Sequence, residues 1–355
     1  MNILFLTPRE SGTNLGGVER HVRLVTEELV KRGHKVKELP LDSLFKGQAL
    51  PRQGLAFAFK FRAWGYLWRN RELFRWAEVV HVHDVFWWYA PFAIINKGLA
   101  LLRQQGQALV SVTFHGWEGV YPPSRSAVWQ KRLAARLSDG TIGVGDFYEK
   151  WYGVKTDKVV WGVLDQRIAK INKGPAFDYK GRALGTGGRI VFLGRLEEVN
   201  GIEVVIEGVA KINKGPALPR QGRAFGSMIF VGDGSWRSQA EKVGKVTGMV
   251  AEPWRYLADA SVVIASSYLA ILEAAGMGKP VIAIANNPLK RDYLEGHPMR
   301  KYFRVAGNAE ELAEELHNGL YKGPAFDYKG RAFASGQTAG KLADVYEELW
   351  NLKLA

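Results

Sequence analysis

Three segments of the chain carry residue types that suit anion binding. Gly16 and Gly17 begin a predicted helix, where backbone N–H groups can approach a phosphate. Arg195 follows a β-branched run, and its planar guanidinium could hold a diphosphate. Glu273 lies one turn into a helix that a pair of serines precedes, so its carboxylate either caps that helix or holds ribose hydroxyls. Each segment also has a plainer explanation, namely a turn, a surface salt bridge or a cap.

A second group of polar residues follows two candidate strands of the N-terminal half. His83 and Asp84 end one strand, His115 ends the next, and Glu118 follows shortly after it. Imidazole and carboxylate groups of this kind can bind a hydroxyl or remove its proton. A solvated polar loop and a structural histidine are the competing interpretations.

The elements around these residues alternate between short β-branched runs and helical periods. Helices are predicted from Gly17 onward and over 202–212, 269–278 and 339–354. The alternation is typical of parallel sheets covered by helices on both faces. Strands are predicted near residues 2–7, 79–83, 108–115, 141–145, 189–195, 261–267 and 280–286, with another that begins within RGHKV at 32–36 and a strand and turn over 227–234.

Length and the restart of this alternation predict two domains. The chain of 355 residues is about twice the size of a common domain. We expect residues 1–164 to form an N-terminal domain and residues 165–338 a C-terminal one, with a glycine-rich linker near 162–188. The amphipathic helix within 339–355 is expected to cross back to the N-terminal domain.

Composition excludes several classes of protein. Hydrophobic residues at 47% and charged residues at 24% are typical of a folded globular chain. Because there is no cysteine, disulfides, thiolate metal sites and cysteine nucleophiles are excluded. No run of about 18 apolar residues occurs, and the first residues form neither a basic leader nor a cleavage site. These features predict a cytoplasmic protein that is not exported and does not span a membrane.

The net charge of +14 first suggests nucleic acid or an anionic membrane as a partner. Four copies of a KGPAF-like peptide carry +9 of that charge, and they begin at Lys46, Lys173, Lys214 and Lys322. Their irregular spacing argues against a solenoid, and their glycines and prolines predict surface turns and short hairpins inserted into the fold. A nucleic-acid-binding element is the alternative, but the +5 that remains elsewhere makes nucleic acid a poor candidate partner.

An aromatic and basic stretch at 57–76 suggests a membrane surface. The stretch would put Phe57, Phe61, Trp64 and Trp68 on one helical face, with lysine and arginine around them. Such a helix suits the interface of an anionic membrane, so peripheral binding to its cytoplasmic face is predicted. A core-facing stripe whose cations reach past it to water is the competing interpretation.

Five motifs, in order, give the chain a resemblance to a known family. They are GGVERHV at 16–22, HG at 115–116, FLGRL and NGIEVVIEGVAKI within 192–212, FVGDG at 230–234 and LEAAGMGKPVIA at 272–283. They resemble the retaining, nucleotide-sugar-dependent glycosyltransferases of family four (glycosyl transferases group 1), over nearly the whole chain outside the repeats. The resemblance implies an α/β, GT-B fold, in which two Rossmann-like, doubly wound parallel-sheet domains face a cleft.

The resemblance also implies roles for single residues. The C-terminal domain would hold a nucleoside diphosphate-sugar and the N-terminal domain the acceptor, with no metal ion and no cofactor; the chain has no D-x-D for a cation. His115, at the donor sugar, and Arg195, at its phosphates, match catalytic positions. Besides Arg195, the donor-binding positions are the glycine turn of Gly16 and Gly17, the N–H groups of Leu269 and Ala270, Glu273 at the ribose, Val250 at the base, Asn200 and Gly232. His83, Asp84 and Glu118 are the acceptor-binding candidates.

Two positions depart from the family pattern. Asn200 stands where the family usually has a lysine, five residues after the arginine. Only YLAIL separates Ser267 from Glu273, so the loop that carries the family's first glutamate is shortened and that glutamate is absent. One missing charged contact of this kind could remove several kcal/mol of transition-state stabilisation.

These observations predict a hexosyl-type glycosyltransferase that acts with retention of configuration. The predicted partners are a nucleotide sugar and a glycan, lipid-linked or small-molecule acceptor. The alternatives are a weakly active or non-catalytic sugar-nucleotide-binding protein, which the two departures favour, and a nucleotide-sugar epimerase of the same fold. A phosphorylase is disfavoured because no lysine stands out to anchor pyridoxal.

Overall fold

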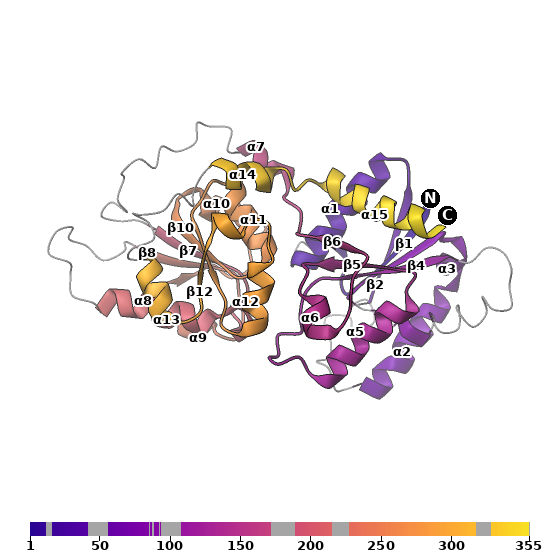
Figure 1. Cartoon of the computed structure of the whole chain (residues 1–355), viewed down its shortest axis with the longest axis horizontal. Coiled ribbons are helices and arrows are strands. Elements are labelled where there is room, and N and C mark those ends of the chain that lie inside the picture. Colours follow the sequence, from indigo (N-terminus) through magenta and orange to yellow (C-terminus); the bar gives the residue numbers. More distant parts are fainter. Residues whose placement is uncertain are drawn as a thin grey trace. The chain divides into compact units, whose positions relative to one another are not determined.

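The computed structural model divides into two compact units (Figure 1). It describes residues 1–11, 16–41, 56–84, 86, 89–91, 93, 108–171, 189–214, 227–316 and 328–354. The first unit comprises Met1–Glu118, Pro122–Val160 and Ala339–Ala355, and the second comprises Gly119–Tyr121 and Trp161–Thr338. The sequence predicts the main boundary at residue 164, whereas the division falls after Val160.

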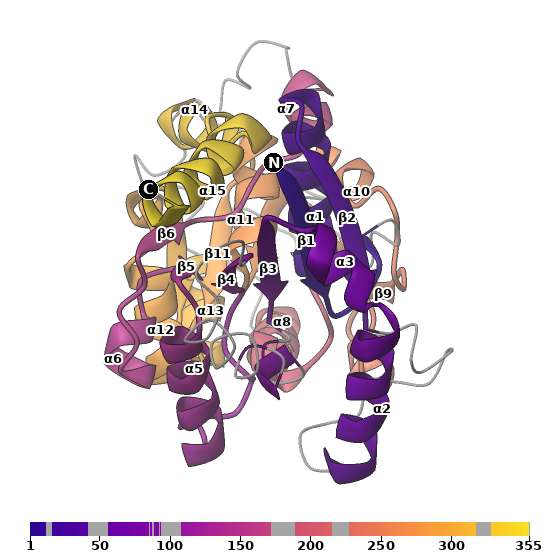
Figure 2. The same cartoon turned by 90° about the vertical axis from the view of Figure 1, so that its right-hand side faces the viewer.

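The first unit is built on a six-stranded sheet in the order β2-β1-β3-β4-β5-β6, with every neighbouring pair parallel. Helices α1 and α15 cover one face, and α5 and α6 cover the other (Figures 1 and 2). Its elements are β1 (Asn2–Thr7), α1 (Gly17–Lys31), β2 (Lys35–Pro40), α2 (Ala56–Arg69), α3 (Arg71–Trp76), β3 (Val79–His83), β4 (Leu109–Phe114), α5 (Arg125–Leu137), β5 (Gly140–Val144), α6 (Tyr148–Tyr152), β6 (Lys158–Val160) and α15 (Ala339–Leu354).

The second unit has a parallel six-stranded sheet in the order β12-β11-β10-β7-β8-β9, which is the Rossmann strand order. Its elements are α7 (Gln166–Ile171), β7 (Arg189–Leu193), the 3-10 helix η3 (Glu198–Asn200), α8 (Ile202–Lys214), β8 (Ser227–Val231), α9 (Arg237–Ala240), β9 (Lys245–Val246), α10 (Trp254–Ala258), β10 (Ala260–Ala265), α11 (Tyr268–Gly276), β11 (Val281–Ile284), α12 (Pro288–Glu295), the 3-10 helix η4 (Arg300–Tyr302), β12 (Arg304–Ala306), α13 (Ala309–Glu314) and α14 (Tyr328–Ser335).

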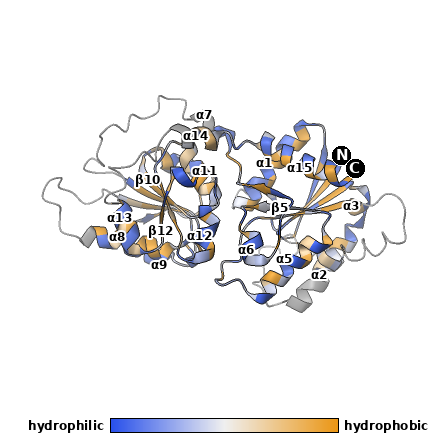
Figure 3. Cartoon of the chain, in the orientation of Figure 1, coloured by the Kyte–Doolittle hydropathy of each residue, from blue (hydrophilic) through white to orange (hydrophobic). Residues whose placement is uncertain are grey.

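Continuous apolar strands explain why both sheets lie inside helical layers. The central strands β3, β4 and β5 are buried along their whole length, as expected for parallel strands with both faces covered. Figure 3 shows these hydrophobic strands between helices that are hydrophilic on their outer sides. The predicted doubly wound α/β class is therefore confirmed in both units.

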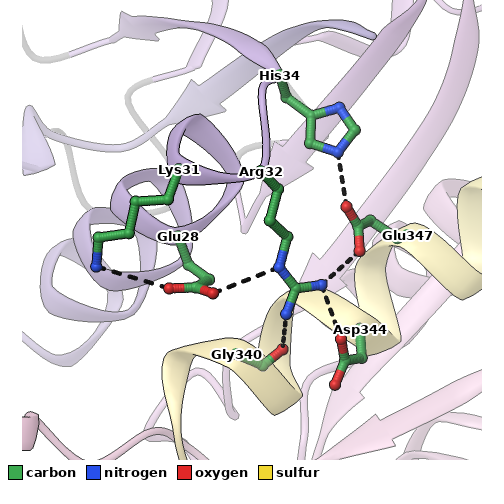
Figure 4. A network of polar contacts seen from close by, with 7 residues as sticks. All are labelled: Glu28, Lys31, Arg32, His34, Gly340, Asp344 and Glu347. Atoms are coloured by element: carbon green, nitrogen blue, oxygen red, sulfur yellow. Dashed lines mark hydrogen bonds and ion pairs between the residues drawn. The ribbon is translucent and has the colours of Figure 1, made fainter.

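The C-terminal helix α15 is part of the first unit. Arg32, at the end of α1, donates to Asp344, Glu347 and the Gly340 carbonyl of α15, and His34 hydrogen-bonds Glu347 at 2.6 Å (Figure 4). Burial alone would raise the pKa of Glu347, but the hydrogen bonds from His34 and Arg32 lower it below its ordinary value. These contacts hold α15 against α1.

The stretch 57–76 forms two helices, because α2 ends at Arg69 and α3 begins at Arg71. The four aromatic positions predicted to share a helical face, Phe57, Phe61, Trp64 and Trp68, all lie in α2. Asn70 makes the break, since its side chain donates to the Tyr66 carbonyl while its own carbonyl accepts from Leu73.

The last repeat copy is not wholly a surface turn, because its end forms α14, which packs against α11 with Ala334 fully buried. A helix that buries apolar side chains against another helix gains more than an exposed hairpin would. The other three repeat copies lie mostly outside the described residues.

Candidate functional site

Each sheet reverses its winding at one point, where the carboxyl ends of two neighbouring strands create a binding crevice in this class of fold. In the first unit the reversal lies between β1 and β3, and in the second between β7 and β10. His83 and Asp84 stand at the end of β3, and Arg195 follows β7. The sequence-predicted residues therefore collect at the edges where ligands are expected.

A histidine pair forms the centre of the site in the first unit. His83 Nδ1 lies 2.9 Å from His115 Nε2, and the backbone N–H of His115 donates to Asp84 Oδ1 at 2.9 Å. Asp84 adopts a left-handed backbone with φ of 56°, the one such value among the described non-glycine residues. This turn brings the ends of β3 and β4 together. The histidine His21, on the helix that begins at Gly16 and Gly17, stacks edge-on against His115, with ring centroids 4.6 Å apart.

Burial decides how this pair is protonated. His83 Nε2 is enclosed and has no hydrogen-bond partner. Since an enclosed bare acceptor destabilises a protein less than an enclosed N–H, we assign the His83 proton to Nδ1, from which it is donated to His115. His115 then carries its proton on Nδ1, where none of the described residues accepts it. Burial, assisted by the charge on Lys131, lowers the pKa of His115 to about 3, so the ring is a neutral N–H donor.

A buried chain of hydrogen bonds connects α15 to the histidines. Trp350 of α15 donates to Ser111, which lies 2.6 Å from His81 Nδ1. His81 Nε2 meets Thr113 at 2.7 Å, and Thr113 meets Tyr346 at 2.9 Å. The chain ends where the Tyr346 hydroxyl reaches His21 Nε2, also at 2.9 Å. Because tryptophan can only donate, one direction of donation satisfies most groups along the chain.

Glu118 is engaged inside the protein. Its carboxylate pairs with Lys131 at 2.9 Å and accepts from the Tyr152 hydroxyl at 2.7 Å. The Lys131 ammonium also lies 5.3 Å from the centroid of the Phe114 ring. The pKa of Asp84, which stands nearby at the surface, is raised because the surrounding protein displaces water, although Lys131 counteracts this effect. Asp84 is therefore better placed than Glu118 to meet an acceptor hydroxyl.

In the second unit, Arg195 leaves the end of β7 and is exposed. Among the residues described, no side chain pairs with its guanidinium. Asn200, five residues on, does not point at a ligand, because its Nδ2 donates to the Arg195 carbonyl at 2.9 Å. Its own carbonyl accepts from Ser266 at 2.6 Å, which joins this loop to the end of β10.

Two glycines bring the loops after β7 and β8 into contact. Gly232 has φ of 149°, and a Cβ there would lie 1.9 Å from the Gly194 carbonyl oxygen. Gly232 also bridges to Gly248, so the segment that carries Val250 runs beside it. The close approach explains the glycine at 232 and puts the predicted phosphate and base regions along one edge.

Helix α11 begins at the same edge. Its Ser267 cap offers no side-chain hydrogen bond, and the Tyr268 N–H donates to the Tyr293 hydroxyl at 3.0 Å. The predicted N–H donors Leu269 and Ala270 follow within the first turn. Glu273 lies further along and is only 2% exposed.

Several residues near the two candidate sites were not predicted from the sequence. His21 could have been predicted, because it lies one turn into the helix that starts at Gly17. Lys131, Tyr346 and the buried Lys290 could not have been predicted, since each comes from a segment remote in sequence.

Among the described residues, no group of three or more histidine, aspartate or glutamate side chains could hold a metal ion, and no helix is both long and apolar enough to cross a membrane.

Two parallel α/β units, each with polar residues at its reversal point, define a protein of the GT-B class. Residues 15–160 match the model of Glycosyltransferase Family 4, and residues 187–320 match that of Glycosyl transferases group 1. The chain therefore belongs to this glycosyltransferase family, and the predicted recognition is confirmed. No curated protein matches the sequence.

Solved structures share the fold at low identity. A glycosyltransferase from Rickettsia africae is 17% identical, with a TM-score of 0.63 and coverage of 99% of this chain and 98% of that one. Anabaena HepE in complex with UDP is 16% identical, with a TM-score of 0.61 and coverage of 98% and 99%. The UDP-GlcNAc 2-epimerase of Neisseria meningitidis, bound to UDP-GlcNAc, is 14% identical, with a TM-score of 0.57 and coverage of 98% and 99%.

Proposed function

We propose that the protein transfers a sugar from a nucleoside diphosphate-sugar to an acceptor hydroxyl with retention of configuration, and without a metal ion or further cofactor. The observation that carries this proposal is the unpaired Arg195 at the reversal point of a Rossmann unit. An arginine with no partner among the described residues, beside the N-terminus of α11, suits a diphosphate leaving group. The family membership supports the reaction class.

The proposed chemistry needs charge stabilisation more than proton transfer by the protein. The bond between the anomeric carbon and the diphosphate oxygen breaks, and the acceptor oxygen attacks from the same side. The leaving diphosphate takes the acceptor proton, while Arg195 and the N–H groups of Leu269 and Ala270 stabilise its negative charge. His115 would donate its Nδ1 proton in a hydrogen bond to a sugar oxygen, and Asp84 would orient the acceptor.

The first experiment measures donor binding and turnover. Wild-type protein is incubated with UDP-, GDP-, ADP- and dTDP-sugars, while thermal shift and nucleoside diphosphate release are followed. One donor should stabilise the protein, and release should disappear in Arg195→Met but persist in Arg255→Met, an exposed control arginine of the same unit. Binding without turnover under any acceptor would favour the non-catalytic alternative, and absence of binding would overturn both.

An epimerase of the same fold is the second candidate, since the Neisseria enzyme shares this architecture. It would convert its nucleotide sugar without an acceptor and without net release of nucleoside diphosphate. Product analysis after incubation with UDP-GlcNAc alone separates the two: a new epimer supports the epimerase, and unchanged donor supports the transferase.

We also propose cytoplasmic localisation and peripheral membrane binding through α2. Trp68 is 61% exposed there, whereas Ala63 and Leu67 of the same helix are buried. Exposed tryptophan beside arginine suits the interface of an anionic membrane. Co-sedimentation with phosphatidylglycerol vesicles should weaken in Trp68→Ala but not in Trp129→Ala, a control tryptophan that is 53% exposed on α5. Equal binding by both variants would contradict this role.

A further inference from the structure

Lys290, on α12, is a buried cation without an anionic partner. The residue is 3% exposed, and its ammonium lies 4.4 Å from the centroid of the Tyr293 ring. None of the described residues supplies a carboxylate or a hydrogen-bond acceptor for it. Removing an unpaired charge from water destabilises a fold. The position of this ammonium is therefore not explained by stability.

Helix α12 is tied to both parts of the predicted diphosphate site. Asn286, just before the helix, donates to the Glu198 carbonyl at 3.0 Å and so contacts the loop that follows Arg195. Tyr293 accepts the N–H of Tyr268, the first residue of α11. The contacts hold Lys290 at the edge where the arginine loop and the N-terminus of α11 come together.

The charge of Arg195 acts on Lys290 electrostatically. Burial first, and repulsion by the Arg195 charge second, lower the pKa of Lys290 to about 7. Two cations that repel one another, with no acid between them among the described residues, form an arrangement that a bound anion would stabilise. The Lys290 nitrogen is not among the fully enclosed unpartnered atoms of those residues, so it keeps a small accessible area.

We propose that Lys290 supplies the second positive charge to the diphosphate of the sugar donor, in place of the family lysine that is missing at Asn200. Asn200 is occupied within its own loop, since it donates to the Arg195 carbonyl. Lys290 would reach the same anion from α12, the helix that follows β11, whereas Asn200 lies in the segment that follows β7. This inference rests on the proposed function, because it assumes a nucleoside diphosphate at Arg195.

The test compares a nucleoside diphosphate with its monophosphate. Affinities for UDP and UMP, or for the corresponding pair of the base that the wild type prefers, are measured by calorimetry. Lys290→Met should weaken diphosphate binding about 10- to 100-fold, the range for one hydrogen bond to a charged group, and change monophosphate binding less than about threefold. Lys279→Met is the matched control, because this second buried lysine donates to the Ala258 carbonyl. It should leave both affinities unchanged.

A rescue variant tests whether the charge itself matters. In the Lys290→Met background, Asn200→Lys should regain part of the lost diphosphate affinity, because it returns a positive charge to the same anion. No gain would count against a shared anion. Equal losses for diphosphate and monophosphate, or none, would overturn the assignment.

The outcomes separate this inference from the proposed function. If the wild type binds no nucleoside diphosphate, both are overturned. If Arg195→Met abolishes diphosphate binding and Lys290→Met does not weaken it, only the inference is overturned.

Discussion

The two units differ in whether the charged residues of their candidate sites have partners within the protein. In the first unit the charged groups already have protein partners: Glu118 pairs with Lys131, and Asp84 accepts the His115 N–H. In the second unit, Arg195 and Lys290 have no carboxylate partner among the described residues. A site with internal partners is organised before its ligand binds, whereas unpaired cations are stabilised only when an anion binds.

The difference suggests a division of labour. The first unit offers neutral or compensated groups, which suit uncharged hydroxyls of a sugar or an acceptor. The second offers uncompensated positive charge, which suits a diphosphate. Variants of the first unit should therefore affect stability or transfer, and variants of the second should affect nucleotide affinity.

The largest effect is expected from breaking the polar chain of the first unit. Trp350→Ala removes a fully buried indole and leaves Ser111 without its donor, so the free energy of unfolding should fall by about 3–5 kcal/mol. Urea denaturation followed by circular dichroism measures it. Leu352→Ala, which is 65% exposed on the same helix, should change it by less than about 0.5 kcal/mol. Equal stability of the two variants would mean that α15 contributes little to the first unit.

The next effect should separate transfer from nucleotide binding. His115→Ala removes the neutral N–H donor that we propose for the sugar, so turnover should fall about 100- to 1,000-fold, while diphosphate affinity stays within about threefold. Because the pKa of His115 is about 3, the wild-type rate should show no limb near pH 6.5 from this residue. Initial rates of diphosphate release test both points, with His34→Gln, a histidine of the network between α1 and α15, as control. A comparable loss of diphosphate affinity in His115→Ala would contradict the claim that residues of the first unit affect transfer rather than nucleotide affinity.

A smaller, opposite effect is expected from the second unit. Lys290→Met removes an unpaired buried charge, so the ligand-free protein should gain about 1–3 kcal/mol at neutral pH. The sign follows from linkage: the folded-state pKa of about 7 lies below the ordinary lysine value, so the unfolded chain binds more protons between these two pH values. Wild-type stability should therefore rise with pH across that window, relative to the variant. Thermal melts from pH 6 to 10 measure this, with exposed Lys245→Met as control; a less stable Lys290→Met would contradict an unpaired charge.

The smallest effect concerns the surface network between α1 and α15. Arg32→Gln removes contacts that join residues far apart in sequence, yet these charges are partly exposed, so the loss should be about 1 kcal/mol or less. Arg75→Gln, which loses a local pair with Glu72, should cost about 0.3 kcal/mol. Denaturation at low and high salt compares them, and the gap should close at about 1 M salt. An equally large gap at high salt would show that packing, not charge, fixes the helix.

Much of the fold could be predicted because buried parallel strands are continuous apolar runs. VVHVH at 79–83 and RIVFL at 189–193 were recognisable from composition alone, and both are central strands. The end of the last repeat was not predictable in this way, since glycine and proline nearby indicate turns, and α14 is helical only because α11 supplies an apolar surface to pack on. Tertiary packing overrides local preference there.

The sequence by itself determined the class of protein and predicted a first residue of each candidate site, since Arg195 and His115 follow strands within ordered motifs. What only the tertiary structure decided is which groups complete those sites. Tyr346 hydrogen-bonds His21 from the far end of the chain, and we propose that Lys290 acts with Arg195 from another helix. Sequence spacing cannot reveal such pairs, because electrostatic and hydrogen-bonding forces depend on distance in space, and folding alone sets that distance.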